Sequence, residues 1–318
     1  MSAATDRQLL DSAIARLRET GEIAYTGEFG VEITTFVPFI FWLKTRGMLS
    51  GRRVLTYAGM RSYYHFLDDA EYAEQSRARV WLPPEQRTWP SNSSYTATRQ
   101  DWHRIPDYRA RFAEEGMVFE RPVLFIQNKF CVEWGEGPIN YLPLKALERL
   151  FALAGERFDV VYSRPRAMDG RGDYAADDNS DCDYPDLAMA RRFSAVLVLE
   201  DHVAANGLDY NLTKLQIAAK AHLFVAVQGG GAHLLACFGD SLLLLLHRVG
   251  DEYPHCYAAG PYTYLADPPP LLLVARDTAP LMRGIELVAD ARLVEGRLQL
   301  PAQWRPLTVE LSVSHGGQ

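Results

Sequence analysis

From residue 122 onward, the sequence alternates short, continuous apolar runs with segments of helical character, and this rhythm constrains the fold more than any other feature. The apolar runs cover 123–127, 159–163, 195–199, 223–227, 242–247 and 271–275. Helical patterns lie among them over 142–154, 211–221 and 232–238. Strands that are apolar along their whole length are typical of parallel sheets with helices on both faces. The pattern predicts an α/β fold whose ligands bind beyond the carboxyl ends of the strands.

The first part of the chain is expected to form a second α/β unit. Its expected elements are helices over 6–19 and 32–45 and strands over 23–25 and 54–57. The pattern changes near residue 120, after a stretch rich in Pro, Trp and Arg. We therefore predict an N-terminal domain over 1–120, a second domain over 121–290, and a C-terminal tail over 291–318 that packs back on the first domain.

Composition and charge exclude several classes of protein. Apolar residues make up 48% and charged residues 23% of the 318 residues, as in ordinary globular chains, which argues against disorder, collagen and coiled coil. Asp and Glu outnumber Lys and Arg by 40 to 33, and the net charge of −7 is a poor match for nucleic acid. The four cysteines show no CxxC spacing, which suits a reducing compartment. With no apolar leader and no run of roughly 18 apolar residues, we expect a cytoplasmic protein without a transmembrane segment.

The most informative local motif is the glycine triplet Gly229, Gly230 and Gly231, which follows an apolar run and is flanked by Gln228 and His233. Glycines allow a ligand to approach the backbone, and a helix N-terminus offers unpaired N–H groups, so the motif suits a diphosphate. The alternative is a tight strand–helix turn with no ligand. The motif lacks the Lys-Ser/Thr of a Walker A loop and the spacing of GxGxxG, so a nicotinamide cofactor is disfavoured.

Polar residues follow three more of the predicted strands. Asn128 and Lys129 follow the run over 123–127, and Arg164 follows the run over 159–163, with Arg166 close behind. If the sheet is parallel, these cations converge with the glycine triplet and neutralise a diphosphate. The alternative is that they cap strand ends in solvent. Glu200, after the run over 195–199, is a candidate acceptor of hydrogen bonds from a ribose or a base.

Carboxylates supply the candidates for a general base. Glu28 and Glu32 lie where a short strand leads through glycines into a helix, and either is able to take a proton from an attacking hydroxyl. The alternative is that both are first-turn acids stabilised by the helix dipole. Asp181 and Asp183 form a DxD triplet that could hold a metal, but the surrounding acidic stretch favours a solvated loop. The histidines show no metal-ligand spacing, and we expect no metal site.

Three segments resemble bacterial polysaccharide glycosyltransferases of the GT-B type. The segment Glu28-Phe29-Gly30-Val31-Glu32 is similar to the Gly-Glu-Phe-Gly-Trp-Glu of their first loop and helix, with Val31 in place of the Trp. Residues 128–141 resemble the opening of their second domain. Residues 228–233 are similar to their His-Gly-Ala-Gly turn, with Gln228 in place of the His. The likeness covers residues 21–70 and 120–240.

The resemblance implies two Rossmann-like domains facing across a cleft, the second holding a nucleotide-sugar donor and the first a saccharide or glycan acceptor. It implies metal-independent transfer of the sugar to an acceptor hydroxyl by Glu28 or Glu32. Lys129 and Arg164 would then stabilise the leaving diphosphate, so that Arg164→Ala is expected to lower turnover far more than stability. The basic and aromatic stretch over 76–112 leaves room for peripheral contact with a membrane-bound acceptor.

Several functions remain open at this point. Other enzymes on a GT-B-like scaffold, such as a sugar-nucleotide epimerase or a pyruvyl transferase, fit the same features. A catalytically silent scaffold that binds a glycan or a partner also fits, since a fold does not fix a function. A metal-dependent transferase that uses Asp181 and Asp183 is a further alternative. The sequence does not decide between inverting and retaining chemistry.

Overall fold

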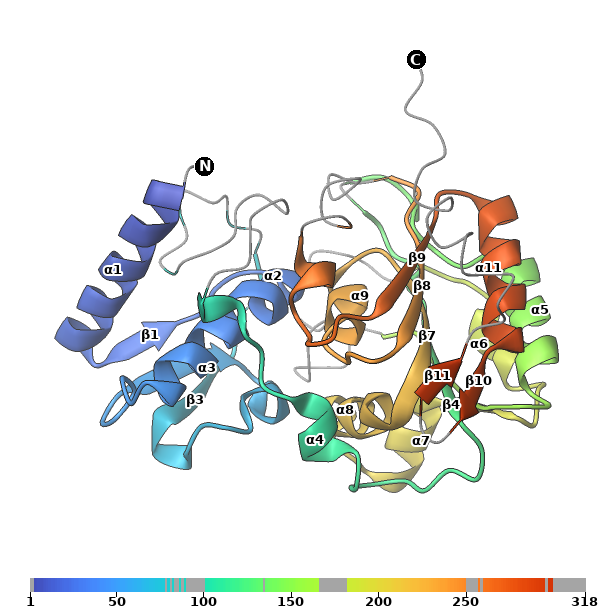
Figure 1. Cartoon of the computed structure of the whole chain (residues 1–318), viewed down its shortest axis with the longest axis horizontal. Coiled ribbons are helices and arrows are strands. Elements are labelled where there is room, and N and C mark those ends of the chain that lie inside the picture. The colour runs from blue at the N-terminus through green and yellow to red at the C-terminus, as the bar shows by residue number, and fades with distance from the viewer. Residues whose placement is uncertain are drawn as a thin grey trace, which may run out of the picture.

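The computed structural model describes residues 3–77, 79–80, 82, 86, 89, 101–133, 135–165, 182–249, 257, 260–294 and 297–299. The protein is an α/β protein built on two parallel sheets, one of three strands and one of six. In Figure 1 the three-stranded sheet lies at the left and the six-stranded sheet at the right. A short antiparallel hairpin of β10 (Arg292–Val294) and β11 (Arg297–Gln299) follows the larger sheet along the chain.

The larger sheet has the strand order of a doubly wound fold. The order is β6 (Val196–Val198), β5 (Asp159–Ser163), β4 (Val123–Gln127), β7 (Ala221–Val227), β8 (Leu242–Leu246) and β9 (Leu271–Ala275). Numbered along the chain this is 3-2-1-4-5-6, the order of Rossmann sheets, and every neighbouring pair is parallel. The order reverses between β4 and β7, and sheets of this kind bind ligands in the crevice at such a switch point.

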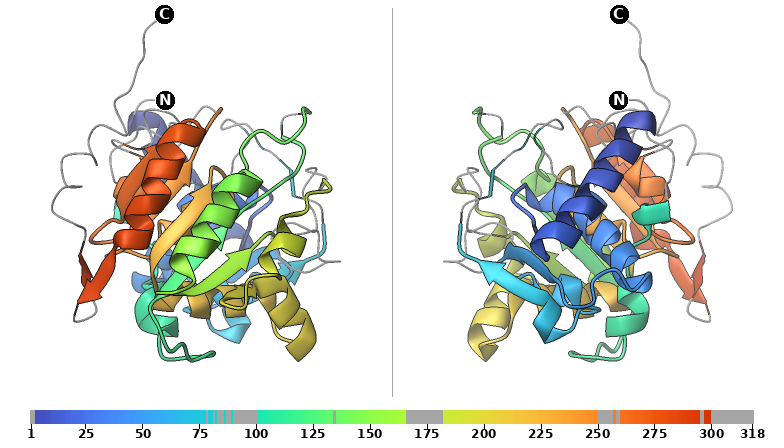
Figure 2. Two further views of the ribbon diagram at one scale, coloured as in Figure 1. Left: turned by 90° about the vertical axis from the view of Figure 1, so that its right-hand side faces the viewer. Right: turned by 90° about the vertical axis from the view of Figure 1, so that its left-hand side faces the viewer.

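Helices cover both faces of this sheet. Two of them, α5 (Leu144–Ala154) and α11 (Thr278–Asp290), lie on the face turned away from the smaller sheet, whereas α8 (Tyr210–Lys220) and α9 (Gly230–Leu235) lie on the opposite face (Figure 1 and Figure 2). We call these the α5/α11 face and the α8/α9 face. The leucine run of β8 divides between two hydrophobic cores, one on each face, because successive side chains of a strand point in opposite directions.

Side-chain caps explain where several helices begin. Asp209 precedes α8 and its carboxylate accepts a hydrogen bond from the N–H of Leu212 at 2.7 Å. Asp277 caps α11 in the same way through the N–H of Ala279. Each carboxylate satisfies a backbone donor that has no partner within its own helix, which fixes the helix start.

The N-terminal unit, defined here as residues 3–77, carries the smaller sheet. Its strands are β1 (Glu22–Ala24), β2 (Arg53–Tyr57) and β3 (Tyr72–Gln75), all parallel in that order. Its helices are α1 (Ala3–Thr20), α2 (Phe29–Val31), a π-helical turn over Glu32–Phe36 and α3 (Val37–Thr45). The last three form one continuous helix, which widens just before Pro38, a residue with no N–H to donate. Two short 3-10 turns, Arg61–Tyr64 and Asp69–Glu71, lead into β3.

The short helix α4 (Tyr108–Phe112) contacts both units. The hydroxyl of Tyr108 donates to the carbonyl of Tyr63 at 3.1 Å in the N-terminal unit. The neighbouring Arg109 donates to the carbonyls of Ala219 at 2.6 Å and Ala221 at 2.8 Å, where α8 leads into β7. One hydrophobic core therefore runs from the N-terminal unit to the α8/α9 face of the larger sheet.

The predicted α/β class and the predicted parallel sheet are confirmed. The strands expected over 123–127 and 159–163 match β4 and β5 residue for residue. Helix α7 (Leu199–Asn206) was not predicted, because it begins directly where β6 ends and shares its apolar run. The domain boundaries at 120 and 290 stay predictions. Residues 300–318 of the predicted tail lie outside the described residues.

Close packing between the two units predicts the effect of one substitution. A Cβ on Gly230 would stand 2.9 Å from the backbone nitrogen of Gly30 and 2.8 Å from the ring of Phe29. Gly230→Ala is therefore expected to lower the free energy of unfolding by about 1–3 kcal/mol, because the backbone of another unit must move. Gly137→Ala is the matched control, since its Cβ meets nothing within 4 Å. Urea denaturation of both variants tests this, and equal stability would show that the two units do not pack as described.

Candidate functional site

The carboxyl ends of β4 and β7 lie side by side at the switch point. Gln127 ends β4 and pairs in register with Ala226 of β7, so the residues that follow each strand are neighbours. The structure thereby brings together two of the predicted site residues. The ammonium nitrogen of Lys129 lies 3.3 Å from the position that a Cβ on Gly229 would take, and Gly229 adopts a φ of +134° that favours glycine.

A buried carboxylate that the sequence analysis did not single out holds Lys129 in this place. Lys129 Nζ lies 2.7 Å from Oε2 of Glu133, whose side chain is almost fully buried. Glu133 Oε1 also accepts hydrogen bonds from the backbone N–H groups of Ile139 and Asn140, at 3.2 and 2.8 Å. Because these backbone bonds fix the carboxylate, the ammonium group is oriented before any ligand arrives.

Asn140 forms hydrogen bonds with the loops that follow three neighbouring strands, β4, β7 and β8. Its side-chain amide donates to Glu133 Oε2 at 3.1 Å and to the side-chain oxygen of Gln228 at 3.5 Å. Its side-chain oxygen accepts from the backbone N–H of Arg248 at 2.8 Å, just after β8. Gln228, a predicted site residue, is thus fixed through Asn140 to the loop that carries Lys129.

The predicted residues Asn128 and Arg164 belong to a different network. Asn128 donates to the hydroxyl of Tyr162 at 3.0 Å, and Tyr162 donates in turn to Asp186, at the start of α6 (Asp186–Ala190). Arg164 is buried and lies 3.5 Å from the same carboxylate. Tyr162 packs in the core of the α5/α11 face, so this network lies on that side of the sheet.

The alternation of side chains along strands accounts for this separation. Phe125 and Val161 pack in the core of the α8/α9 face, so Gln127 and Ser163, two residues further on, continue that side. Residues 128 and 164 each come one position later, so their side chains continue the opposite, α5/α11 side of the sheet. The expected convergence of Lys129 and Arg164 on one ligand stays a prediction, and Arg166 lies outside the described residues.

Each glycine of the triplet has a packing role. Gly229 has a positive φ that favours glycine, and Gly230 packs on the backbone of Gly30. A Cβ on Gly231 would overlap the side-chain amide of Gln127. His233 is buried one turn further on, and its Nδ1 lies 3.1 Å from where a Cβ on Gly30 would stand. The tight strand–helix turn considered as the alternative is thus present, and it forms part of the contact with the N-terminal unit.

The two base candidates have different surroundings. Glu32 is fully buried, and its Oε2 pairs with Arg79 at 2.8 Å. Its Oε1 accepts hydrogen bonds from the hydroxyls of Tyr64, at 2.8 Å, and of Thr56. Glu28 is only half-buried and precedes α2 in extended backbone. Glu32 is thus enclosed by three partners, whereas the Glu28 residue is only partly buried.

Glu200 lies on the α8/α9 side of the sheet, beyond β6. Its Oε1 accepts a hydrogen bond from the hydroxyl of Ser163 at 2.8 Å and one from Tyr210 at 3.3 Å. Burial raises the pKa of Glu200 above its ordinary value, and the hydrogen bonds from Ser163 and Tyr210 oppose that shift. Oε2 is buried and has no hydrogen-bond partner among the described residues.

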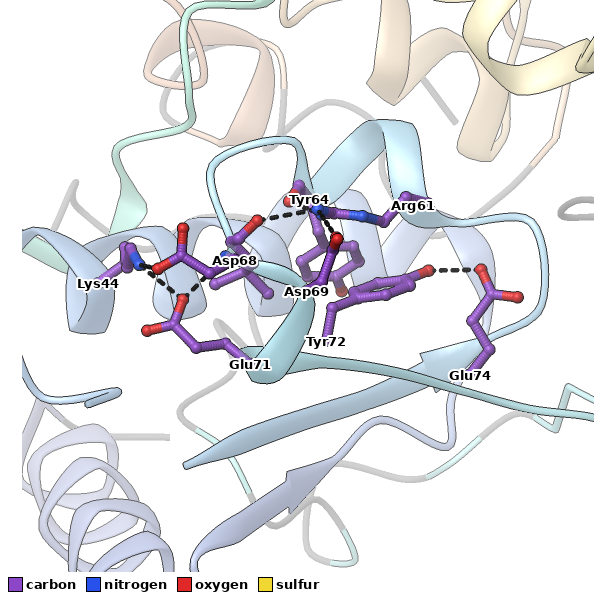
Figure 3. Close-up of polar contacts among 9 residues, drawn as sticks. Lys44, Arg61, Tyr64, Asp68, Asp69, Glu71, Tyr72 and Glu74 are labelled. Atoms are coloured by element: carbon purple, nitrogen blue, oxygen red, sulfur yellow. Dashed lines mark hydrogen bonds and ion pairs between the residues drawn. The ribbon is translucent and has the colours of Figure 1, made fainter. Parts of the chain in front are cut away.

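The acids of the N-terminal unit that follow Tyr64 have structural partners. Lys44 forms ion pairs with Asp68 and Glu71, at 2.9 and 2.6 Å, and Arg61 pairs with Asp69 at 3.0 Å (Figure 3). The carboxylate of Glu71 also accepts the N–H of Asp68, so this cluster caps the 3-10 turn before β3. The cluster accounts for these acids without catalysis.

The fold and this edge of the sheet define a doubly wound α/β protein with a polar cluster at its switch point. Neither a scan against models of known protein families nor a search of curated proteins finds a match to the chain. Among the helices that the structure describes, none is both long and apolar enough to cross a membrane. In the described ranges no three acidic, His or Cys side chains gather as a metal site requires, and Asp181 lies outside those ranges, so the expected independence of metal stays a prediction.

The buried pair of Arg164 and Asp186 predicts a loss of stability. Arg164→Ala leaves Asp186 buried without its cation, which is expected to cost about 3–5 kcal/mol of unfolding free energy. A diphosphate-binding role would instead predict that Arg164→Ala lowers turnover far more than stability. Arg191→Ala is the control, because Arg191 pairs with Asp201 at 2.7 Å where both are about half exposed, and such pairs contribute about 0–1 kcal/mol. Similar urea midpoints for the two variants would contradict the structural role of Arg164.

Glu200 predicts a pH dependence of stability. Because its pKa is raised in the folded state, the folded protein keeps this proton at pH values where the unfolded chain has lost it. Its contribution to stability is therefore complete below the ordinary pKa and falls as the pH rises from there through the raised value. The difference in unfolding free energy between the wild type and Glu200→Gln, measured from pH 4 to 8, should fall with rising pH. A flat difference would show that Glu200 titrates normally.

Proposed function

We propose that the protein is a glycosyltransferase that binds a nucleotide-sugar donor at the switch point between β4 and β7. The observation that carries the proposal is the placement of Lys129 by Glu133 against Gly229. A Rossmann-ordered sheet reverses at these two strand ends, and this is where such sheets bind nucleotides. A buried carboxylate that orients a single cation at this point supports the binding of an anionic ligand there.

The proposed reaction uses residues from both units. Glu28 takes the proton from an acceptor hydroxyl, and the hydroxyl oxygen forms a bond to the anomeric carbon of the donor sugar. The bond from that carbon to the diphosphate oxygen breaks, and negative charge grows on the leaving phosphate. The ammonium group of Lys129 stabilises this charge, which is larger in the transition state than in the bound donor. The half-buried position of Glu28 supports it over Glu32 as the base.

The arrangement of the two units supports a donor side and an acceptor side, as in GT-B enzymes. The larger sheet presents the switch point, and the N-terminal unit approaches it through Phe29 and Gly30. Residue 28 precedes this contact directly, so the base candidate lies on the unit opposite the donor site. An acceptor then enters between the two units.

A catalytically silent scaffold is the second candidate, and the packing of Gly30 on Gly230 favours it. This contact and the enclosed pair of Glu32 and Arg79 show that motifs like those of a transferase have structural roles here. A scaffold of this kind binds no nucleoside diphosphate, which separates it from the transferase.

Thermal denaturation with and without nucleoside diphosphates tests the proposal. One of the uridine, adenosine, guanosine, cytidine or thymidine diphosphates is expected to raise the midpoint, with or without magnesium, because ligands stabilise the state that binds them. Lys129→Met should weaken that ligand roughly 10- to 100-fold, since it removes a hydrogen bond to a charged group. Glu133 keeps its backbone donors in this variant but loses its cation, so some loss of stability is expected as well, and the affinity is compared at a temperature at which the variant is folded.

Lys145→Met is the control, because Lys145 is exposed on α5 at the other face of the sheet. Equal affinity of Lys129→Met and the wild type would remove Lys129 from the site. No response to any of the five diphosphates would favour the scaffold.

A further inference from the structure

A second polar cluster lies on the α8/α9 side of the sheet, next to the glycine turn, and the proposed transfer does not use it. It consists of Gln127, Ser163, Glu200, Tyr210 and Lys214, from the ends of β4 and β5 and the starts of α7 and α8. We call it the β5-end cluster. The side chains of Ser163, Gln127 and Lys214 are buried, as is most of Tyr210.

Strand pairing, hydrogen bonds and a ring contact connect the members of the cluster. Gln127 and Ser163 are paired in register on adjacent strands, so their side chains leave the same face. The hydroxyl of Ser163 lies 2.8 Å from Glu200 Oε1 and 3.0 Å from the hydroxyl of Tyr210. One helical turn along α8, the ammonium nitrogen of Lys214 lies 5.0 Å from the centre of the Tyr210 ring. The cluster is therefore continuous from the switch point to Lys214.

Two acceptors in the cluster are buried with no hydrogen-bond partner among the described residues, Gln127 Oε1 and Glu200 Oε2. An unsatisfied buried polar atom costs about 1–3 kcal/mol, and folded proteins contain few of them. Hydroxyl groups of a ligand are the donors that would satisfy both. Since Gln127 is also packed against Gly231, its side chain has little freedom to find another partner.

Lys214 adds a buried cation to these acceptors. Its side chain is 0% exposed, and its ammonium nitrogen lies 5.4 Å from the ring centre of Phe29, which belongs to the N-terminal unit. Phe29 also covers Gly230, so one ring separates Lys214 from the glycine turn. Burying a lysine carries a desolvation cost even when it has a partner. Because Lys214 is fully buried, the side chains that cover it must move before a ligand reaches this ammonium group.

We propose that the β5-end cluster is a binding site for a phosphorylated polyol, with Lys214 on the phosphate and Gln127 and Glu200 on the hydroxyls. A ribosyl phosphate, as found in a nucleotide, has this chemistry. The inference rests on the proposed function in one respect, which is that the ribosyl phosphate belongs to the donor nucleotide. Lys214, rather than Arg164, is then the second cation on the α8/α9 side.

Calorimetric titration with ribose 5-phosphate, ribose and inorganic phosphate tests the site. The wild type should bind ribose 5-phosphate more tightly than either of the other two. Lys214→Met should weaken ribose 5-phosphate roughly 10- to 100-fold. Lys145→Met, on the opposite face, should bind as the wild type does.

Gln127→Met tests the same site without changing a charge, and it decides the matter if Lys214→Met does not fold. It removes an unsatisfied buried acceptor while keeping the length of the side chain. This variant should be at least as stable as the wild type and should weaken ribose 5-phosphate roughly tenfold, with no effect on inorganic phosphate. Wild-type affinity for ribose 5-phosphate in whichever of these variants fold, or no binding of any probe to the wild type, would overturn the inference.

Uridine and guanosine diphosphates separate this inference from the proposed function. If Lys129→Met loses nucleotide binding and Lys214→Met does not, the nucleotide site stands and the β5-end cluster is not part of it. If ribose 5-phosphate binds through Lys214 while neither these two nor the other three nucleoside diphosphates bind, the cluster is a site for a sugar phosphate and the nucleotide-donor function is wrong.

Discussion

The alternation of side chains along β4 and β5 is the constraint on which the rest of the site depends. Both strands are buried on both faces, and successive side chains at their carboxyl ends point to opposite sides of the sheet. Gln127 and Ser163 are directed to the side that the N-terminal unit covers. Asn128 and Arg164 are directed to the side of α5 and α11, where Asp186 neutralises the guanidinium.

Buried carboxylates then decide which cations remain for a ligand. Arg164 is enclosed with Asp186, whereas the Lys129 side chain stays 18% exposed beside Glu133. Glu133 has backbone donors of its own and therefore orients Lys129 without depending on it. The result is a cation held at the switch point by a loop that Asn140 fastens to the neighbouring strand ends.

Much of the fold could be predicted from the sequence, because fully buried parallel strands leave uninterrupted apolar runs. The edge strand β3, which carries Glu74 and Gln75, leaves no such run, and it was missed. The site was less predictable. Lys129 and the glycine triplet follow strands directly. Glu133 and Asn140 contact their partners only because the loop after β4 folds back on itself, and no local sequence pattern predicts this. In the sequence, Lys214 looks like any exposed lysine of an amphipathic helix. Its burial depends on the N-terminal unit, which covers it in the folded structure.

The central claim is that ligands bind on the α8/α9 side of the switch point, between the two units. Hydrogen exchange of the backbone, with and without uridine or guanosine diphosphate, tests this claim directly because it reports protection along the whole chain. The account predicts that the nucleotide that binds slows exchange at 127–129, at 228–231 and in the first turn of α8, with no change around Asp186. Protection around Arg164 and Asp186, with none at the glycine turn, would contradict it.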